Sequence, residues 1–122
     1  MKLNDKNAGL GAEKCAATFL QSQGLKLVTQ NYHCRFGEID LIMQDTKTLV
    51  FVEVRLRSNA KFGGAGDSIT PQKQQKLIAT AQHYLQQHGQ VHGNPACRFD
   101  AVLMHKADLQ QIEWIRNAFE TL

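Results

Sequence analysis

The 122-residue sequence lacks any apolar run approaching the roughly 18 residues that a membrane span needs. No apolar signal region follows the polar N-terminal residues, so nothing predicts export. Its three cysteines, Cys15, Cys34 and Cys97, are odd in number and widely separated. They have no Cys-x-x-Cys spacing, which argues against a disulfide framework and against a zinc knuckle. These absences predict a cytoplasmic protein with no membrane contact, whose cysteines are reduced packing residues.

The chain also lacks internal repeats, low-complexity segments and linkers that would divide it. Its five histidines show no tight metal-ligand spacing, so we interpret them as surface residues. A hydrophobic fraction of 43% and a charged fraction of 20% are ordinary for a globular protein. The length suits one domain with a sizeable core. We therefore expect a single domain over residues 1–122.

The distribution of charge is more informative than the net charge of +3. Residues 55–76 contain one acid, Asp67, and five basic residues, namely Arg55, Arg57, Lys61, Lys73 and Lys76. Such a basic stretch would attract a phosphate-bearing ligand. The alternative, a solvated loop and helix face, is equally consistent with charge alone.

Apolar residues at helical spacing predict two helices. The first spans residues 7–23 and ends at Gly24, and its apolar stripe is Ala12, Cys15, Ala16, Phe19 and Leu20. The second begins with Thr70 as N-cap and Pro71 at the first helical position, and it ends at Gly89. Its stripe is Leu77, Ile78, Ala81, Tyr84 and Leu85.

Alternating apolar residues predict strands, which cover residues 25–32, 37–44, 48–57, 97–105 and 112–115. A glycine-rich loop is expected between the third strand and the second helix. The resulting order, α-β-β-β-α-β-β, predicts an α/β fold with a mixed central sheet flanked by helices.

The second and third strands carry acids where a packed hairpin does not favour them. A turn centred on residues 46–47 places Asp40 opposite Glu53, and Glu38 opposite Arg55. Like charges directly opposite destabilise a sheet, but two carboxylates with Cβ atoms roughly 5 Å apart suit a bridging divalent cation. The pattern thus predicts a metal site at Asp40 and Glu53 and a cross-strand ion pair between Glu38 and Arg55. Alternatively, the acids are rim carboxylates satisfied by basic residues or water, and a one-residue slip would separate them.

Several ordered motifs resemble those of the bacterial YraN-like proteins. They are GEIDLI at 37–42, LVFVEV at 49–54, FGG at 62–64, TPQKQQKL at 70–77 and RFDAV at 98–102, together with Gly11 and Glu13 in the first helix. This uncharacterised family is placed in the PD-(D/E)XK restriction-endonuclease-like superfamily. The resemblance covers most of the chain and implies the α-β-β-β-α-β core of archaeal Holliday-junction resolvases and many restriction enzymes.

The resemblance also implies catalytic roles for individual residues. Asp40 matches the metal-binding aspartate, Glu53 begins the Glu-x-Lys motif, and Glu13 matches a helical glutamate beside the metal. Arg55 stands where the motif has lysine. Arginine stays charged and is a poor general base, although it can stabilise charge developing on a phosphate. Without the resemblance, Glu13 would be a surface helix residue.

Other polar residues are consistent with either a ligand-binding role or a purely structural one. Gln74 faces inward near a helix N-terminus, where anions are favoured, or is simply a partly buried polar residue. Lys73 and Lys76 point to the other side of that turn and would contact phosphates or only aid solubility. Arg57 and Lys61 belong to the same predicted nucleic-acid-binding set. Asp100 is predicted to form a structural pair with Arg98, two residues away on one strand face.

The leading hypothesis is an endonuclease dependent on Mg²⁺ or Mn²⁺ that cleaves DNA phosphodiesters, with branched or structured DNA as a suitable substrate. In it Asp40 and Glu53 hold the ion and Arg55 offsets charge in the transition state. The alternative is a non-catalytic nucleic-acid-binding module whose site degenerated with the loss of the motif lysine. A third hypothesis is a protein-interaction adaptor that uses the basic stretch. A homodimer would suit cleavage of two strands.

Overall fold

A computed structural model of the chain describes residues 5–57, 69–93, 95–105 and 108–120. Most of the predicted glycine-rich loop, including Lys61, lies outside these residues. The described elements follow the predicted order and are α1 (Asp5–Ser22), β1 (Lys26–Cys34), β2 (Gly37–Asp45), β3 (Thr48–Arg57), α3 (Pro71–His92), β4 (Ala96–His105) and β5 (Asp108–Phe119). The predicted α/β class with a mixed sheet and flanking helices is confirmed.

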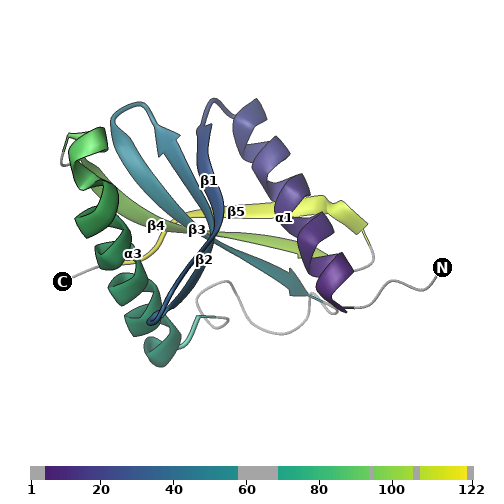
Figure 1. Ribbon diagram of the computed structural model, residues 1–122. Coiled ribbons are helices and arrows are strands. Elements are labelled where there is room, and N and C mark those ends of the chain that lie inside the picture. The colour runs from purple at the N-terminus through teal and green to yellow at the C-terminus, as the bar shows by residue number, and fades with distance from the viewer. Residues whose placement is uncertain (1–4, 58–68, 94, 106–107, 121–122) are drawn as a thin grey trace.

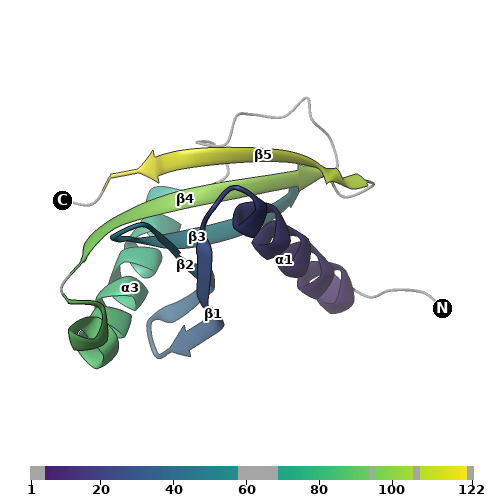
Figure 2. The ribbon, with the colours of Figure 1, turned by 90° about the horizontal axis from the view of Figure 1, so that it is seen from above.

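The five strands form one sheet in the order β1-β2-β3-β4-β5, and β1 and β5 are its edges (Figures 1 and 2). Neighbouring strands are antiparallel except β3 and β4, which run parallel and are connected through α3. A parallel pair requires a long crossover, and a helix supplies it.

The two helices cover opposite faces of the sheet. One apolar cluster joins α1 to Val50 and Val52, whereas the other joins α3 to Leu49 and Phe51. Alternate residues of one strand point to opposite faces, so the two clusters lie on either side of β3. In Figure 1, α3 and α1 accordingly flank the sheet at the left and right.

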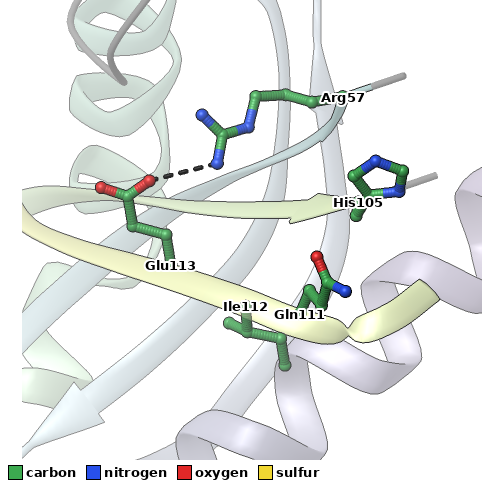
Figure 3. Close-up of a pocket in the computed structure, with 5 residues that line it drawn as sticks. All are labelled: Arg57, His105, Gln111, Ile112 and Glu113. Carbon is green, nitrogen blue, oxygen red and sulfur yellow. Dashed lines mark hydrogen bonds and ion pairs between the residues drawn. The ribbon is translucent and has the colours of Figure 1, made fainter. Parts of the chain in front are cut away.

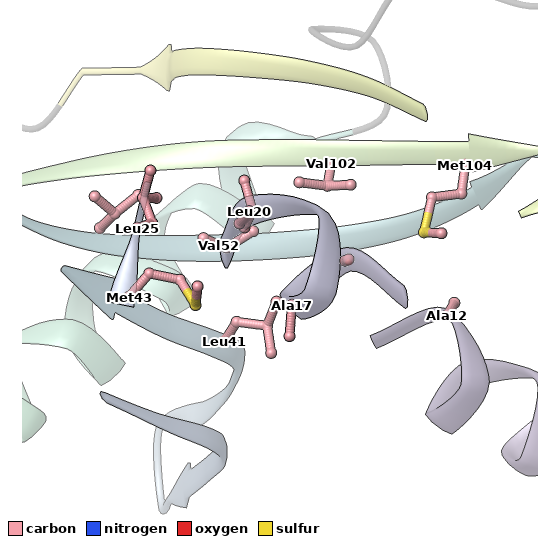
Figure 4. Packing of buried hydrophobic residues seen from close by; sticks show 11 residues of the cluster. Ala12, Ala17, Leu20, Leu25, Leu41, Met43, Val52, Val102 and Met104 are labelled. Atoms are coloured by element: carbon pink, nitrogen blue, oxygen red, sulfur yellow. The ribbon is translucent and has the colours of Figure 1, made fainter. Parts of the chain in front are cut away.

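The predicted apolar stripe of α1 is largely confirmed. Ala12, Ala16 and Leu20 are buried against the sheet, and Figure 4 shows Ala12 and Leu20 among the apolar residues of this cluster. Cys15, predicted as a packing residue, is exposed, as is Cys97. All three cysteines are free thiols. The packing prediction for Cys15 was wrong because α1 buries Ala12, Ala16, Ala17 and Leu20, and Cys15 lies outside this buried row. Cys97 is exposed near the start of β4.

The predicted start of α3 is confirmed and its predicted end was wrong. The Thr70 hydroxyl accepts a hydrogen bond from the Lys73 amide at 3.2 Å, as an N-cap does. Gly89 does not stop the helix, which continues to His92. Gly93 follows with a φ of +70°, a left-handed conformation that favours glycine and ends helices.

A buried carboxylate joins β4 to β5. Asp100 is 1% exposed and accepts hydrogen bonds from Arg98 Nε at 3.1 Å, Trp114 Nε1 at 3.0 Å and the Asn117 amide at 3.0 Å. Arg98 Nη1 also contacts Asp45 of β2 at 2.9 Å. The predicted structural pair of Arg98 and Asp100 is therefore confirmed, within a larger network that also holds the end of β2.

The ladder between β2 and β3 positions the acids of the hairpin. Its register runs from Asp45↔Thr48 to Leu41↔Val52, as the predicted turn requires. Beyond Leu41 the ladder ends, and the Asp40 carboxylate accepts a hydrogen bond from the Val54 amide at 2.8 Å. A side chain thus replaces a backbone acceptor where the two strands separate, and this leaves room for a pocket.

Candidate metal and phosphate site

A pocket of about 170 Å³ lies where β2 and β3 separate, and residues of the first turns of α3 line it as well. Strand β2, strand β3 and helix α3 contribute its lining, which consists of Gly37, Glu38, Asp40, Glu53, Lys73, Lys76 and Leu77. The predicted acid pair and two of the predicted phosphate-binding lysines therefore come together in one place.

Asp40 is mostly removed from water and has little compensating positive charge. Burial is the largest cause that raises its pKa to about 8, and the negative charge of Glu53 adds to it. The hydrogen bond from Val54 opposes this rise, while Glu13 adds to it. Asp40 therefore carries a proton at neutral pH when no cation is bound, because a buried carboxylate beside other carboxylates is costly to ionise.

Glu13 reaches Asp40 from α1, the helix on the other face of the sheet. The two side chains share a hydrogen bond. Burial raises the pKa of Glu13, the hydrogen bond with Asp40 lowers it, and the charges of Glu38 and Glu53 raise it again. With its amide nitrogen turned toward the carboxylate, Asn31 of β1 donates to Glu13 at 2.8 and 3.2 Å. The structure thus places Glu13 beside Asp40, as the resemblance implies.

Glu53 is only 7% exposed, and a lysine from α3 neutralises it. Lys73 Nζ lies 2.8 Å from Glu53 Oε1, whereas Arg55 Nη1 is 3.7 Å from the same oxygen. Lys73, which we expected to face phosphates on the other side of the turn, contacts the acid directly. The sequence spacing could have predicted this contact. Lys73 lies one helical turn before the buried Leu77, so both residues are on the helix face that packs against the sheet.

The remaining predicted residues are distributed more widely. Glu38 forms an ion pair with His33 of β1 at 2.8 Å, so the predicted pair with Arg55 was wrong. In the described part of β2 and β3 the ladder stops before these two residues, which removes the register that would have joined them. Gln74 Nε2 donates to the Ile69 carbonyl at 3.0 Å, a contact at the start of α3.

Arg57 lies in a different pocket, which β3, β4 and β5 form (Figure 3). It pairs with Glu113 at 3.2 Å, and the cavity of about 210 Å³ is also lined by His105, Gln111 and Ile112. Its predicted contact with nucleic acid stays a prediction, as does that of Lys61.

The donor set suits a hard divalent cation with few protein ligands. Across the described residues, no group of three or more His, Cys, Asp or Glu side chains is arranged to hold a metal ion. Mg²⁺, however, is usually bound through one or two carboxylates, water and phosphate oxygens. Asp40 and Glu53 fit that pattern, and burial, together with the negative charge of Glu53, raises the pKa of Asp40 to about 8.

Fold and site together define an α/β protein with an acidic pocket at the open end of a β-hairpin. Residues 12–104 match the uncharacterised protein family UPF0102, and the chain belongs to this family. The matched span contains Glu13, Asp40, Glu53, Arg55 and Lys73. Among the described helices, neither combines the length and apolar character required to cross a membrane.

Curated relatives match over nearly their whole length. The chain is 59% identical over 114 residues to a UPF0102 protein of Nitrosomonas europaea, which covers 93% of this chain and 94% of the relative. It is 54% identical to a UPF0102 protein of Methylobacillus flagellatus, with 93% and 97% covered. A UPF0102 protein of Nitrosospira multiformis is 55% identical, with 92% of each chain covered.

Proposed function

We propose that this protein is a nuclease of the PD-(D/E)XK type that cleaves DNA phosphodiesters with Mg²⁺ or Mn²⁺. The observation that carries the proposal is the meeting of Asp40 and Glu53 in one pocket, where Lys73 contacts Glu53. Glu13 is hydrogen-bonded to Asp40, and Arg55 lies 3.7 Å from Glu53. The order α-β-β-β-α-β within the observed fold supports the superfamily placement.

Three acidic side chains in and beside the pocket have roles in this proposal. Asp40 and Glu53 would hold the cation, and Asp40 would release its proton as it becomes a ligand. The bound ion supplies charge neutralisation at the phosphate and activation of a water molecule. Glu13 shares a hydrogen bond with Asp40. It would thereby orient the Asp40 carboxylate, as residues hydrogen-bonded to a metal ligand do.

Lys73 compensates for the missing lysine of the Glu-x-Lys motif. Its ammonium lies 2.8 Å from Glu53 although its backbone is on α3 rather than β3. A lysine titrates more readily than an arginine and is a compact donor for a water or phosphate oxygen. We propose that Lys73 takes the role that the motif lysine has in the superfamily, while Arg55 stabilises charge on the phosphate.

The test measures cleavage of branched and single-stranded DNA with Mg²⁺ or Mn²⁺. Asp40→Ala and Glu53→Ala should each lower the rate by roughly two orders of magnitude or more. Asp45→Asn is the matched control, because Asp45 is an acid of the same strand that pairs with Arg98 outside the pocket. Metal-dependent cleavage that survives loss of both acids would refute the site.

A second set of variants tests the lysine assignment. Lys73→Met should abolish most activity, and Arg55→Lys in that background should restore part of it by returning a lysine to the motif position. Lys76→Gln controls for general loss of positive charge, because Lys76 lines the same pocket. No loss in Lys73→Met would refute the role of this lysine.

The alternative function is a nucleic-acid-binding module without catalysis. It is favoured by the ion pair of Lys73 with Glu53, which occupies an oxygen that a cation would need. It predicts binding that weakens steeply with salt, no cleavage, and no gain from Arg55→Lys. The adaptor hypothesis, the cytoplasmic location, the single domain and the homodimer stay predictions from the sequence.

A further inference from the structure

The turn between β1 and β2 exposes an aromatic ring beside the candidate site. Phe36 is 40% exposed, and the only other large hydrophobic residue exposed to a similar degree in the described chain is Leu27, at 37%. A lone exposed apolar side chain needs no functional explanation. Phe36 differs from Leu27 because the Arg35 guanidinium lies over its ring, 4.8 Å from the centroid.

The turn is also held against α3 next to the pocket, as the adjacent ribbons of Figure 1 show. A Cβ on Gly37 would lie 3.3 Å from Thr80 Oγ1 and 3.9 Å from Lys76 Cβ, so the backbone approaches the helix closely here. The Phe36 ring packs 6.2 Å from the His83 ring. His83 in turn is hydrogen-bonded to the Tyr32 hydroxyl of β1 at 2.5 Å. The exposed ring is therefore positioned by surrounding contacts.

Charge and position together indicate what the ring would contact. Gly37 directly follows Phe36 and lines the pocket, where Lys73 and Lys76 provide positive charge. Arg35 adds a cation directly over the Phe36 ring. An aromatic ring next to phosphate-attracting cations is the combination that proteins use for single-stranded nucleic acids, because bases stack on the ring and cations follow the backbone.

We propose that Arg35 and Phe36 form a stacking platform for an unpaired base of a nucleic-acid strand whose phosphate lies in the carboxylate pocket. This proposal rests on the proposed function and specifies its substrate class. Bases of an intact duplex already stack on one another and present no face to the ring, whereas single strands and junctions do. The platform therefore favours unpaired DNA over duplex DNA.

The test is binding of a labelled oligothymidylate, followed by fluorescence anisotropy in EDTA so that no cleavage occurs. Phe36→Ala should weaken binding about tenfold, the loss expected when one stacked base is released. Phe36→Tyr keeps the ring and should bind like wild type. Leu27→Ala is the matched control, because it removes an equally exposed apolar side chain from the far end of the β1–β2 hairpin.

A second readout places a probe at the site. Phe36→Trp should show fluorescence quenching when oligothymidylate is added, and Leu27→Trp should not. A blunt duplex should bind wild type and Phe36→Ala with affinities within about twofold of each other. Thermal unfolding of each variant establishes that it is folded.

The outcomes separate this inference from the nuclease proposal. The platform is overturned if Phe36→Ala binds oligothymidylate as tightly as wild type does, or if Phe36→Tyr loses as much affinity as Phe36→Ala. The nuclease proposal is judged separately, and metal-dependent cleavage by wild type would still support it. Equal weakening of duplex binding overturns the preference for unpaired bases. Wild type that binds no nucleic acid at low salt overturns both proposals and favours a protein partner at this surface.

Discussion

Asp40→Asn should make the metal-free protein more stable at neutral and alkaline pH. Asparagine has nearly the shape of a protonated aspartic acid. Its amide oxygen can accept the hydrogen bond from Val54, and its nitrogen can donate to Glu13, the partner of Asp40. The substitution therefore retains the contacts and removes the buried charge that forms as the pH rises.

The size of the gain follows from the pKa of Asp40. Burial, and then the charge of Glu53, raise this pKa from 3.8 to about 8. A group whose pKa is raised by folding stabilises the folded state fully below its unfolded pKa, and this stability is lost as pH rises toward the folded pKa. Each pKa unit corresponds to about 1.4 kcal/mol, so the full shift gives an upper limit of roughly 6 kcal/mol. Because Glu13 shares the proton, we expect a gain of about 2 kcal/mol or more at pH 7.5.

Urea denaturation in EDTA at pH 4, 6, 7.5 and 9 measures the effect. The free energy of unfolding of Asp40→Asn should match wild type at pH 4, exceed it increasingly up to pH 8, and exceed it by a constant amount above. Asp45→Asn should give no such gain, because Asp45 loses an ion pair with Arg98. A difference between Asp40→Asn and wild type that does not change with pH would refute the reasoning.

Three further predictions concern the metal and the core. Mn²⁺ at about 100 times its Kd should stabilise wild type by about 2.7 kcal/mol in a thermal-shift or denaturation assay. Glu53→Gln should abolish this stabilisation. Equal stabilisation of the variant by Mn²⁺ would place the ion elsewhere. Asp100→Ala should cost about 3 kcal/mol in urea denaturation because Arg98 loses its buried partner, and a cost below 1 kcal/mol would contradict it. Leu20→Ala should cost about 2–5 kcal/mol because Leu20 is fully buried, whereas Gln21→Ala, its exposed neighbour, should change the free energy of unfolding little.

Ionising carboxylates that are buried close together costs folding free energy. This cost is consistent with a site that is maintained for binding rather than for stability. Glu53 alternates with Leu49 and Phe51 along β3 and so lies on the face that carries the apolar cluster of α3, where an apolar residue would pack without a charge penalty. A pocket carboxylate whose pKa is raised, as that of Asp40 is, is typical of functional sites. The Asp100 network shows the contrast, because its carboxylate is more buried but accepts four hydrogen bonds from three donor residues.

The sequence by itself determined the local structure and the pairing of the acids. Alternation in β2 and β3, with a two-residue turn between them, leaves one register that buries both apolar faces, and this register brings Asp40 and Glu53 together. The apolar spacing in α1 and α3 likewise required each helix to bury one face. These features depend on residues close to one another along the chain.

Only the tertiary structure decided what surrounds the acids. The contacts of Lys73 with Glu53 and of Glu13 with Asp40 depend on where each helix lies over the sheet, and the platform at Phe36 depends on the close approach of a turn to α3. Sequence spacing determines which face of a helix is buried, but not its position along the sheet. That position results from the simultaneous packing of two apolar clusters on opposite faces, a property of the whole chain rather than of any one segment.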